Sequence, residues 1–245
     1  MAASTSTRVT EAAISATARP DSVPAGSGAP DSGARGRMDR MYRHQRHIYD
    51  LTRKFYLLGR DGMLDDLPAS PGTRICEFGC GTGRNLIRLA RRRPDARLFG
   101  FDVSSEMLTT ARAGLRRAGL EAKVQLAEAP ADGFDPQRLF GVDHFDVVYF
   151  SYVLSMVPDW RAAVDRALGL LRPGGTLAVV DFADQSRASP LRRRALLAWL
   201  ALFDVHPRPE IEVDLLTLAR SLDAEPRHAS VGRGYAYRLM FRMPG

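Results

Sequence analysis

The chain is poor in cysteine and lysine and contains no long apolar run. Cys76 and Cys80 are its only cysteines, which excludes a disulfide framework and any zinc site built from four cysteines. We expect these small thiols to pack in the core rather than to react. No apolar run approaches the roughly 20 residues that a membrane-spanning helix needs. These absences predict a cytoplasmic protein without a metal site.

The positive charge of the chain is almost entirely arginine. Lys54 and Lys123 are the only lysines, and the formal net charge is +7. A basic balance suits nucleic acid, anionic lipid or an acidic metabolite equally well, and it bears on association rather than on fold. Charge alone therefore selects no partner.

Composition divides the chain into a tail and one domain. Residues 1–37 hold almost no large apolar side chain, so we expect a disordered tail. Their bias toward Arg, Ser and Ala also overlaps with that of organelle transit peptides. Residues 38–245 have the length of a single domain. At its start, apolar and aromatic residues at helical spacing predict an N-terminal helical cap over residues 38–66.

Short apolar runs alternate with longer helical patterns after Pro71. This alternation predicts right-handed crossovers and an α/β fold with a doubly wound, mostly parallel sheet of seven strands. Only Gly232, Arg233 and Gly234 separate the last two runs, which is typical of an antiparallel hairpin. The expected strands are Thr73–Phe78, Leu98–Phe101, Ala122–Leu126, Phe145–Phe150, Thr176–Asp181, Ala229–Val231 and Tyr235–Arg242.

A glycine-rich turn follows the first expected strand. Gly79, Gly81 and Gly83 stand between that strand and a helix. Glycine there lets the main chain pass close under a ligand, while the helix N-terminus offers free N–H groups. A dinucleotide fold would need its third glycine one place later, where this chain has Arg84. The spacing therefore disfavours nicotinamide and suits a cofactor that brings only a carboxylate to the helix start.

Asp102 ends the second expected strand and places a carboxylate at the carboxyl edge of the sheet. An acid in this position can accept hydrogen bonds from both hydroxyls of a ribose. Glycine turns and strand-end acids are each common alone. Strand, glycines, helix and acid in this order indicate a nucleoside cofactor.

Over residues 70–245 the chain resembles the class I S-adenosylmethionine-dependent methyltransferases, which have a Rossmann-like fold. Two further landmarks agree, the expected fourth strand within His144–Tyr152 and the turn within Leu171–Leu177. The resemblance implies S-adenosylmethionine as the cofactor. It assigns the methionine end to Glu77, Gly79, Gly81 and Gly83, the ribose to Asp102, and the adenine to Val103, Met107, Glu128 and Ala129.

Residues Met38–Gly62, called the cap segment below, carry a more particular resemblance. The cap segment is similar to the N-terminal segment of betaine-lipid methyltransferases, which convert diacylglyceryl homoserine to its trimethyl form. It is more loosely similar to quinone-biosynthesis C-methyltransferases. The closer match, across Tyr49–Asp61, implies N-methylation of the homoserine amine in three rounds. A quinone C-methyltransferase or a small-amine methyltransferase is the alternative.

An N-terminal helix in this fold can cover the cofactor pocket and exclude water. Tyr42 beside the cofactor and Tyr49 beside the acceptor are candidate aromatic walls, and Tyr152 at the end of the fourth strand is a third. Aromatic faces attract a quaternary ammonium through cation–π contacts. A strong base is optional, because burial beside a sulfonium lowers the pKa of an amine. His206 and Asp181 are candidates for acceptor binding or deprotonation.

The run Leu191–Phe203 combines an arginine cluster with apolar residues. It could pack on the sheet or rest on an anionic membrane surface, which would make the protein peripheral on the inner face of the membrane. Nucleic acid is disfavoured as the acceptor, because Ser151–Leu154 lacks the motif of exocyclic-amine methyltransferases and no RNA-binding module is recognisable. The intact glycine turn argues against a catalytically silent cofactor-binding protein. The oligomeric state stays open.

Overall fold

The computed structural model describes residues 57–131, 133–185, 189–201, 205 and 207–245. The expected tail over residues 1–37 and most of the cap segment lie outside the described residues. Within the range of the expected helical cap, the structure shows the helix α2 (Arg60–Asp66). Among the described residues, no helix combines the length and the apolar content that crossing a membrane requires.

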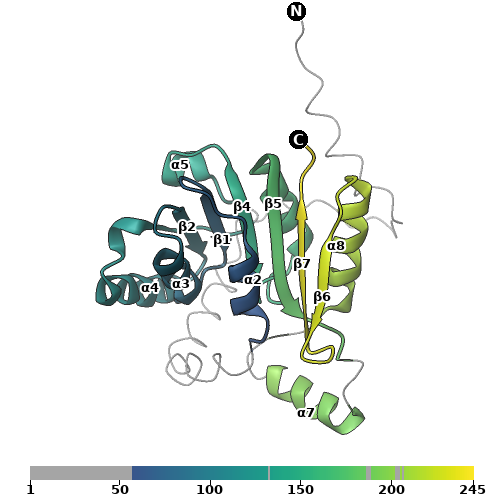
Figure 1. Ribbon diagram of the computed structural model, residues 1–245. Coiled ribbons are helices and arrows are strands. Elements are labelled where there is room, and N and C mark those ends of the chain that lie inside the picture. The colour runs from purple at the N-terminus through teal and green to yellow at the C-terminus, as the bar shows by residue number, and fades with distance from the viewer. Residues whose placement is uncertain (1–56, 132, 186–188, 202–204, 206) are drawn as a thin grey trace, which may run out of the picture.

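The described chain folds around one mixed sheet in the order β3-β2-β1-β4-β5-β7-β6 (Figure 1). Strands β1 to β5 are parallel, while β7 runs antiparallel to both β5 and β6. This arrangement confirms the doubly wound sheet and its closing hairpin. The strands are β1 (Arg74–Phe78), β2 (Arg97–Asp102), β3 (Val124–Glu128), β4 (Phe145–Ser151), β5 (Leu171–Phe182), β6 (Arg227–Val231) and β7 (Ala236–Arg242).

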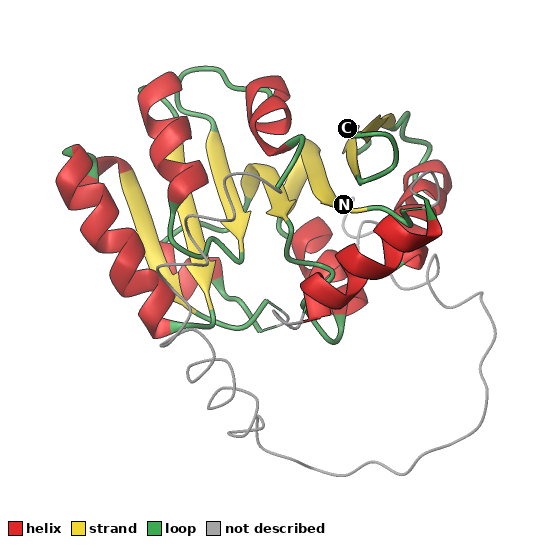
Figure 2. Cartoon of the chain, turned by 90° about the horizontal axis from the view of Figure 1, so that it is seen from below, coloured by secondary structure: helices red, strands yellow, loops and turns green. Residues whose placement is uncertain are grey.

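Helices cover both faces of the sheet (Figure 2). One face packs against α2, α3 and α4, and the other packs against α5, α6 and α8. Both faces are apolar because successive side chains of a strand point to opposite faces of the sheet. In β1, Ile75 packs in the core on the side of α2, α3 and α4, and Cys76 packs in the core on the side of α5, α6 and α8. Both cysteines are buried, as expected. The remaining helices are α3 (Arg84–Arg92), α4 (Ser105–Ala118), α5 (Pro136–Phe140), α6 (Trp160–Gly169), α7 (Pro190–Ala201) and α8 (Pro209–Ser221).

Three strands begin two or more residues away from the start that the apolar pattern predicts, and one of them, β6, begins early, at Arg227 rather than at Ala229. Strand β3 starts two residues late, because Glu121–Lys123 forms a short 3-10 turn. Strand β5 starts at Leu171 rather than at Thr176, and the expected turn becomes an irregularity within the strand, where Gly174 has φ 68° and the register against β4 shifts. The residues that were expected to form a turn before this strand therefore form a bulge within it.

An ionic ladder joins α2 to α3. Arg84 donates to both carboxylate oxygens of Asp61, at 2.5 and 3.1 Å. One turn further, Arg88 lies 3.6 Å from Asp61 and 3.3 Å from Asp65, and Arg92 also pairs with Asp65. The hydrogen bond from Arg84 is the main reason that the pKa of Asp61 is lowered. The ladder therefore fixes the start of α2 beside the start of α3.

Gly100 in β2 tests how tightly the sheet packs against α3. A Cβ at this position would lie 2.5 Å from Leu86 Cδ1 and 3.0 Å from Cys80 Cβ. We expect Gly100→Ala to lower the free energy of unfolding by about 1–3 kcal/mol through overpacking. Gly169→Ala is the matched control, since nothing lies within 4 Å of a Cβ at the end of α6. Equal urea unfolding midpoints for the two variants would contradict this packing.

Candidate functional site

The turn between β1 and α3 requires glycine at three positions. Gly79, Gly81 and Gly83 have φ of 67, 53 and 72°, in the left-handed region that favours glycine. A Cβ at Gly79 would also lie 2.8 Å from both methyl groups of Val153. The turn thus passes close to the segment after β4, and it confirms the glycine pattern of the sequence.

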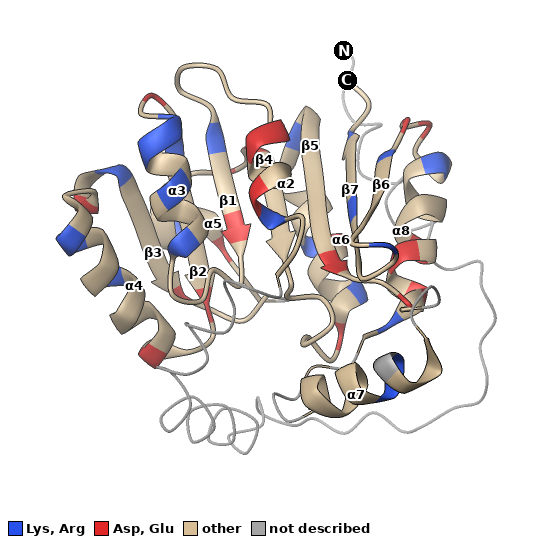
Figure 3. Ribbon diagram, turned by 60° about the horizontal axis from the view of Figure 1, so that its bottom comes forward, with Lys and Arg blue, Asp and Glu red and all other residues tan. Residues whose placement is uncertain are grey.

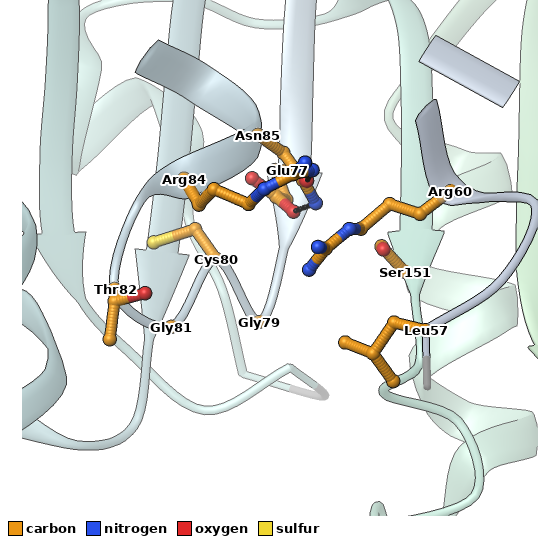
Figure 4. Close-up of a pocket in the computed structure, with 10 residues that line it drawn as sticks. All are labelled: Leu57, Arg60, Glu77, Gly79, Cys80, Gly81, Thr82, Arg84, Asn85 and Ser151. Atoms are coloured by element: carbon orange, nitrogen blue, oxygen red, sulfur yellow. Dashed lines mark hydrogen bonds between the residues drawn. The ribbon is translucent and has the colours of Figure 1, made fainter. Parts of the chain in front are cut away.

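Two adjoining pockets meet at this turn, and Gly79 and Gly81 line both. The first, of about 300 Å³, is mainly apolar. The second, of about 290 Å³, is called the polar pocket here because most of its lining residues are polar or charged; it is shown in Figure 4. The apolar pocket includes the expected adenine neighbours Val103, Met107 and Ala129, together with Asp102, Tyr152, Met156 and Val157. The polar pocket includes Leu57, Arg60, Glu77, Asn85 and Ser151.

Asp102 lines the apolar pocket and holds the turn that both pockets share. Its Oδ2 accepts from the N–H of Gly81 at 2.8 Å, and its Oδ1 accepts from the N–H of Ser104 at 2.9 Å. Each carboxylate oxygen can accept a further hydrogen bond, because it has two lone pairs. Asp102 can therefore stabilise the turn and receive the hydroxyls of a ribose at the same time.

Glu77 is the buried acid of the polar pocket. Its side chain is 1% exposed, and its Oε1 accepts from the amide of Asn85 at 2.7 Å. Its Oε2 is buried and has no hydrogen-bond partner among the described residues. Burial raises the pKa of Glu77 to about 8, although the hydrogen bond from Asn85, the nearby hydroxyl of Tyr149 and the positive charge of Arg60 oppose that rise. This oxygen suits a ligand that brings its own N–H donors and positive charge.

Arg60 brings positive charge to the same pocket. It is 7% exposed, and its guanidinium points into the pocket toward Glu77 (Figure 4). It is the first residue of α2, next to Asp61 of the ionic ladder. No local pattern in the sequence marks Arg60 or Asn85 as functional, although both lie in stretches that carry the family resemblance. Their roles follow from the meeting of α2 with α3, which no local pattern reveals.

Tyr152 anchors the described end of the cap segment. Its hydroxyl donates to the carbonyl of Leu58 at 2.6 Å, and its ring packs edge-on against Phe182 at 4.7 Å between centroids. The side chain is 2% exposed, so its hydroxyl is engaged in holding the chain. It also lines the apolar pocket, and its expected contact with an acceptor stays a prediction.

The other candidate residues fall into three groups. Asp181 is buried and accepts from the N–H of Ser155 at 3.1 Å and of Phe182 at 2.8 Å, so it holds the turn after β4. Burial raises its pKa to about 6. Glu128 is exposed at the end of β3, and Gly83 caps α3; neither is among the pocket-lining residues named for the two pockets. Tyr42, Tyr49 and His206 lie outside the described residues.

Comparison with known proteins agrees with this geometry. A methyltransferase-domain family model matches residues 76–177. Trans-aconitate 2-methyltransferase of Methylobacterium radiotolerans is 36% identical over 48% of this chain and 41% of its own length. The biotin biosynthesis bifunctional protein BioCD of Bordetella avium is 32% identical over 70% of this chain and 34% of its own length. The chain thus spans less than half the length of these two relatives.

Solved structures extend the agreement in fold. Mitomycin 7-O-methyltransferase MmcR superposes with a TM-score of 0.66 at 18% identity, over 85% of this chain and 60% of that one. At this identity the likeness concerns the fold alone. The glycine turn, the strand-end Asp102 and the methyltransferase-domain match carry the assignment further. Residues 76–177 therefore form a methyltransferase domain of the class I S-adenosylmethionine-dependent type, with S-adenosylmethionine as cofactor.

Proposed function

We propose that the protein methylates the amine of a lipid head group, diacylglyceryl homoserine, and adds three methyl groups. One observation carries the proposal. The described end of the cap segment, on which the resemblance to betaine-lipid methyltransferases depends, forms a wall of the polar pocket through Leu57 and Arg60. The part of the chain that is particular to this resemblance therefore meets the cofactor site.

The residues of the two pockets fit S-adenosylmethionine. The buried Oε2 of Glu77 has no partner among the described residues and would accept from the methionine ammonium. Arg60 would pair with the methionine carboxylate. Asp102 would hold the ribose, and the apolar walls formed by Val103, Met107 and Ala129 would enclose the adenine. Glu128 would receive the adenine amino group from the end of β3.

For this reaction the chain has to align the acceptor amine with the methyl group of the cofactor. It also has to keep the amine neutral, so that its nitrogen has a free lone pair. Bound S-adenosylmethionine supplies a methyl group activated by its sulfonium. Ser151 ends β4 in the polar pocket, and its buried Oγ has no hydrogen-bond partner among the described residues. In the first two rounds this hydroxyl would accept from an N–H of the acceptor and turn the lone pair toward the cofactor, and the ammonium formed in each round would lose a proton to water before the next. The tertiary amine of the third round has no N–H, so the pocket walls alone would orient it. Leu57 would exclude water, and burial would favour the neutral amine.

Methylation of a carboxylic acid is a second candidate. Trans-aconitate 2-methyltransferases of several bacteria are similar to this chain. The buried cation Arg60, which lines the polar pocket beside Ser151, would attract a carboxylate acceptor. The two candidates differ in the product, since one carries new methyl groups on nitrogen and the other on a carboxylate oxygen. We found no contact among the described residues that favours a carbon acceptor such as a quinone.

Replacement of Asp102 tests the cofactor site. We expect Asp102→Ala to weaken S-adenosylmethionine binding roughly ten- to hundredfold, because charged hydrogen bonds to the ribose are lost. Stability should fall as well, since the N–H groups of Gly81 and Ser104 lose their acceptor. Asp143→Ala, which removes an exposed carboxylate before β4, is the control. Unchanged affinity by calorimetry for Asp102→Ala would remove this residue from the site.

The order of products tests the acceptor. Purified protein is incubated with S-adenosylmethionine and diacylglyceryl homoserine in detergent micelles, and the lipid is followed by mass spectrometry. We expect monomethyl and dimethyl species before the trimethyl product, at which the reaction stops because nitrogen has no lone pair left. Methyl groups on carbon or oxygen, or a permanent stop after one methyl, would contradict the proposal.

A further inference from the structure

Two exposed leucines, Leu58 and Leu191, lie on the side of the molecule where the parallel strands end. The large apolar side chains that are exposed among the described residues are Leu58, Leu191 and Val213, at 39, 79 and 61%. Leu58 belongs to the cap segment, and Leu191 belongs to the first turn of α7, which lies beyond the carboxyl ends of β5 and the start of β7 in Figure 1. Exposed leucines on the same side of the sheet as the pockets are compatible with an apolar partner.

Leu58 is held against the turn between β6 and β7. Its carbonyl accepts from the hydroxyl of Tyr152, and a Cβ at Gly232 would lie 2.9 Å from its Cδ1. The next residue of that turn, Arg233, is exposed and has φ 59°. An apolar and a basic side chain are thus neighbours at this end of the hairpin.

Helix α7 also presents apolar and basic side chains to solvent. Its Leu200 is buried in the cluster that contains Tyr152 and Phe182, so its last turns are anchored to the domain. At its start, Leu191, Arg193 and Arg194 are exposed, and Arg193 Nε donates to the carbonyl of Asp184 at 3.3 Å. The helix contains no acidic residue, and Figure 3 shows blue and no red on it.

We propose that these five residues, Leu58, Leu191, Arg193, Arg194 and Arg233, form a docking rim for an anionic lipid bilayer. The inference rests on the proposed function, because a diacyl acceptor has to reach the pocket from a membrane. Positive charge complements an anionic leaflet, and exposed leucines can enter its interfacial region. The rim and the pockets share the carboxyl edge of the sheet, so docking brings the polar pocket to the lipid head groups.

The size of the effect follows from the charges. Each arginine near an anionic leaflet strengthens binding about fivefold, and salt screens the attraction within roughly 10 Å. Arg193→Gln with Arg194→Gln should therefore weaken vesicle binding about twenty-five-fold. Leu191→Ser should weaken it about tenfold, since the variant has no leucine side chain for the bilayer to bury.

Vesicle co-sedimentation of the full chain tests the rim. The vesicles contain one-third phosphatidylglycerol and two-thirds phosphatidylcholine, and phosphatidylcholine alone serves as the neutral lipid. We expect binding to the anionic vesicles that falls with salt and with both rim variants. The matched control is Arg116→Gln with Arg117→Gln, which removes the same charge from the last turn of α4 at the opposite edge of the sheet. Circular dichroism and thermal unfolding verify that every variant folds.

Three results would overturn the proposal. Equal loss of binding for the control and the Arg193/Arg194 variant would show unspecific attraction to basic protein. Equal binding to neutral and anionic vesicles would exclude the electrostatic rim. Self-association that the rim variants abolish, without vesicle binding by the unchanged protein, would assign the rim to a second copy of the chain.

Failure of the docking proposal differs from failure of the proposed function. If the protein methylates the lipid in micelles but binds no vesicle, the proposed function stands and the docking proposal is wrong. If the protein binds anionic vesicles through the rim but methylates no lipid amine, the docking proposal stands and the proposed function is wrong.

Discussion

A carboxylate inside a protein needs donors or positive charge around it, because its burial without them costs several kcal/mol. Glu77 meets only part of that need within the described chain. Asn85 satisfies one oxygen, Arg60 contributes positive charge, and the other oxygen is buried without a hydrogen-bond partner among the described residues. The rest of the site is arranged around this acid. The glycine turn begins directly after β1, the strand that carries Glu77. Helix α2, which the ionic ladder holds beside α3, places Arg60 in the same pocket.

The sequence predicts those parts of the fold and site that depend on local pattern. A short apolar run before the glycine turn predicts β1, and the Gly232–Gly234 turn predicts the hairpin, because both signals act within a few residues. Asp102 is predictable because a strand end fixes where its side chain lies. The start of β5 is not, since a bulge and a turn use the same residues.

Contacts between distant segments explain what the sequence did not reveal. Arg60 reaches Glu77 because Asp61 pairs with Arg84, and each partner alone has the appearance of a surface charge. Tyr152 has the appearance of an acceptor contact, yet its hydroxyl holds the carbonyl of Leu58. Asp181 was a candidate base, and its burial with two backbone donors makes it an anchor for the turn after β4. Such roles depend on tertiary packing that residue type and spacing do not encode.

The pH dependence of cofactor binding tests the central claim, that ionised Glu77 accepts the methionine ammonium. Burial raises the pKa of the free protein's Glu77 to about 8, so the carboxyl is protonated at lower pH and must release its proton to bind. Calorimetry with S-adenosylhomocysteine should show affinity that falls roughly tenfold per pH unit below that pKa. Glu77→Gln should bind weakly at every pH, and methylthioadenosine, which lacks the amino acid, should show no such dependence. The same pH profile for both ligands, or for both proteins, would contradict the account.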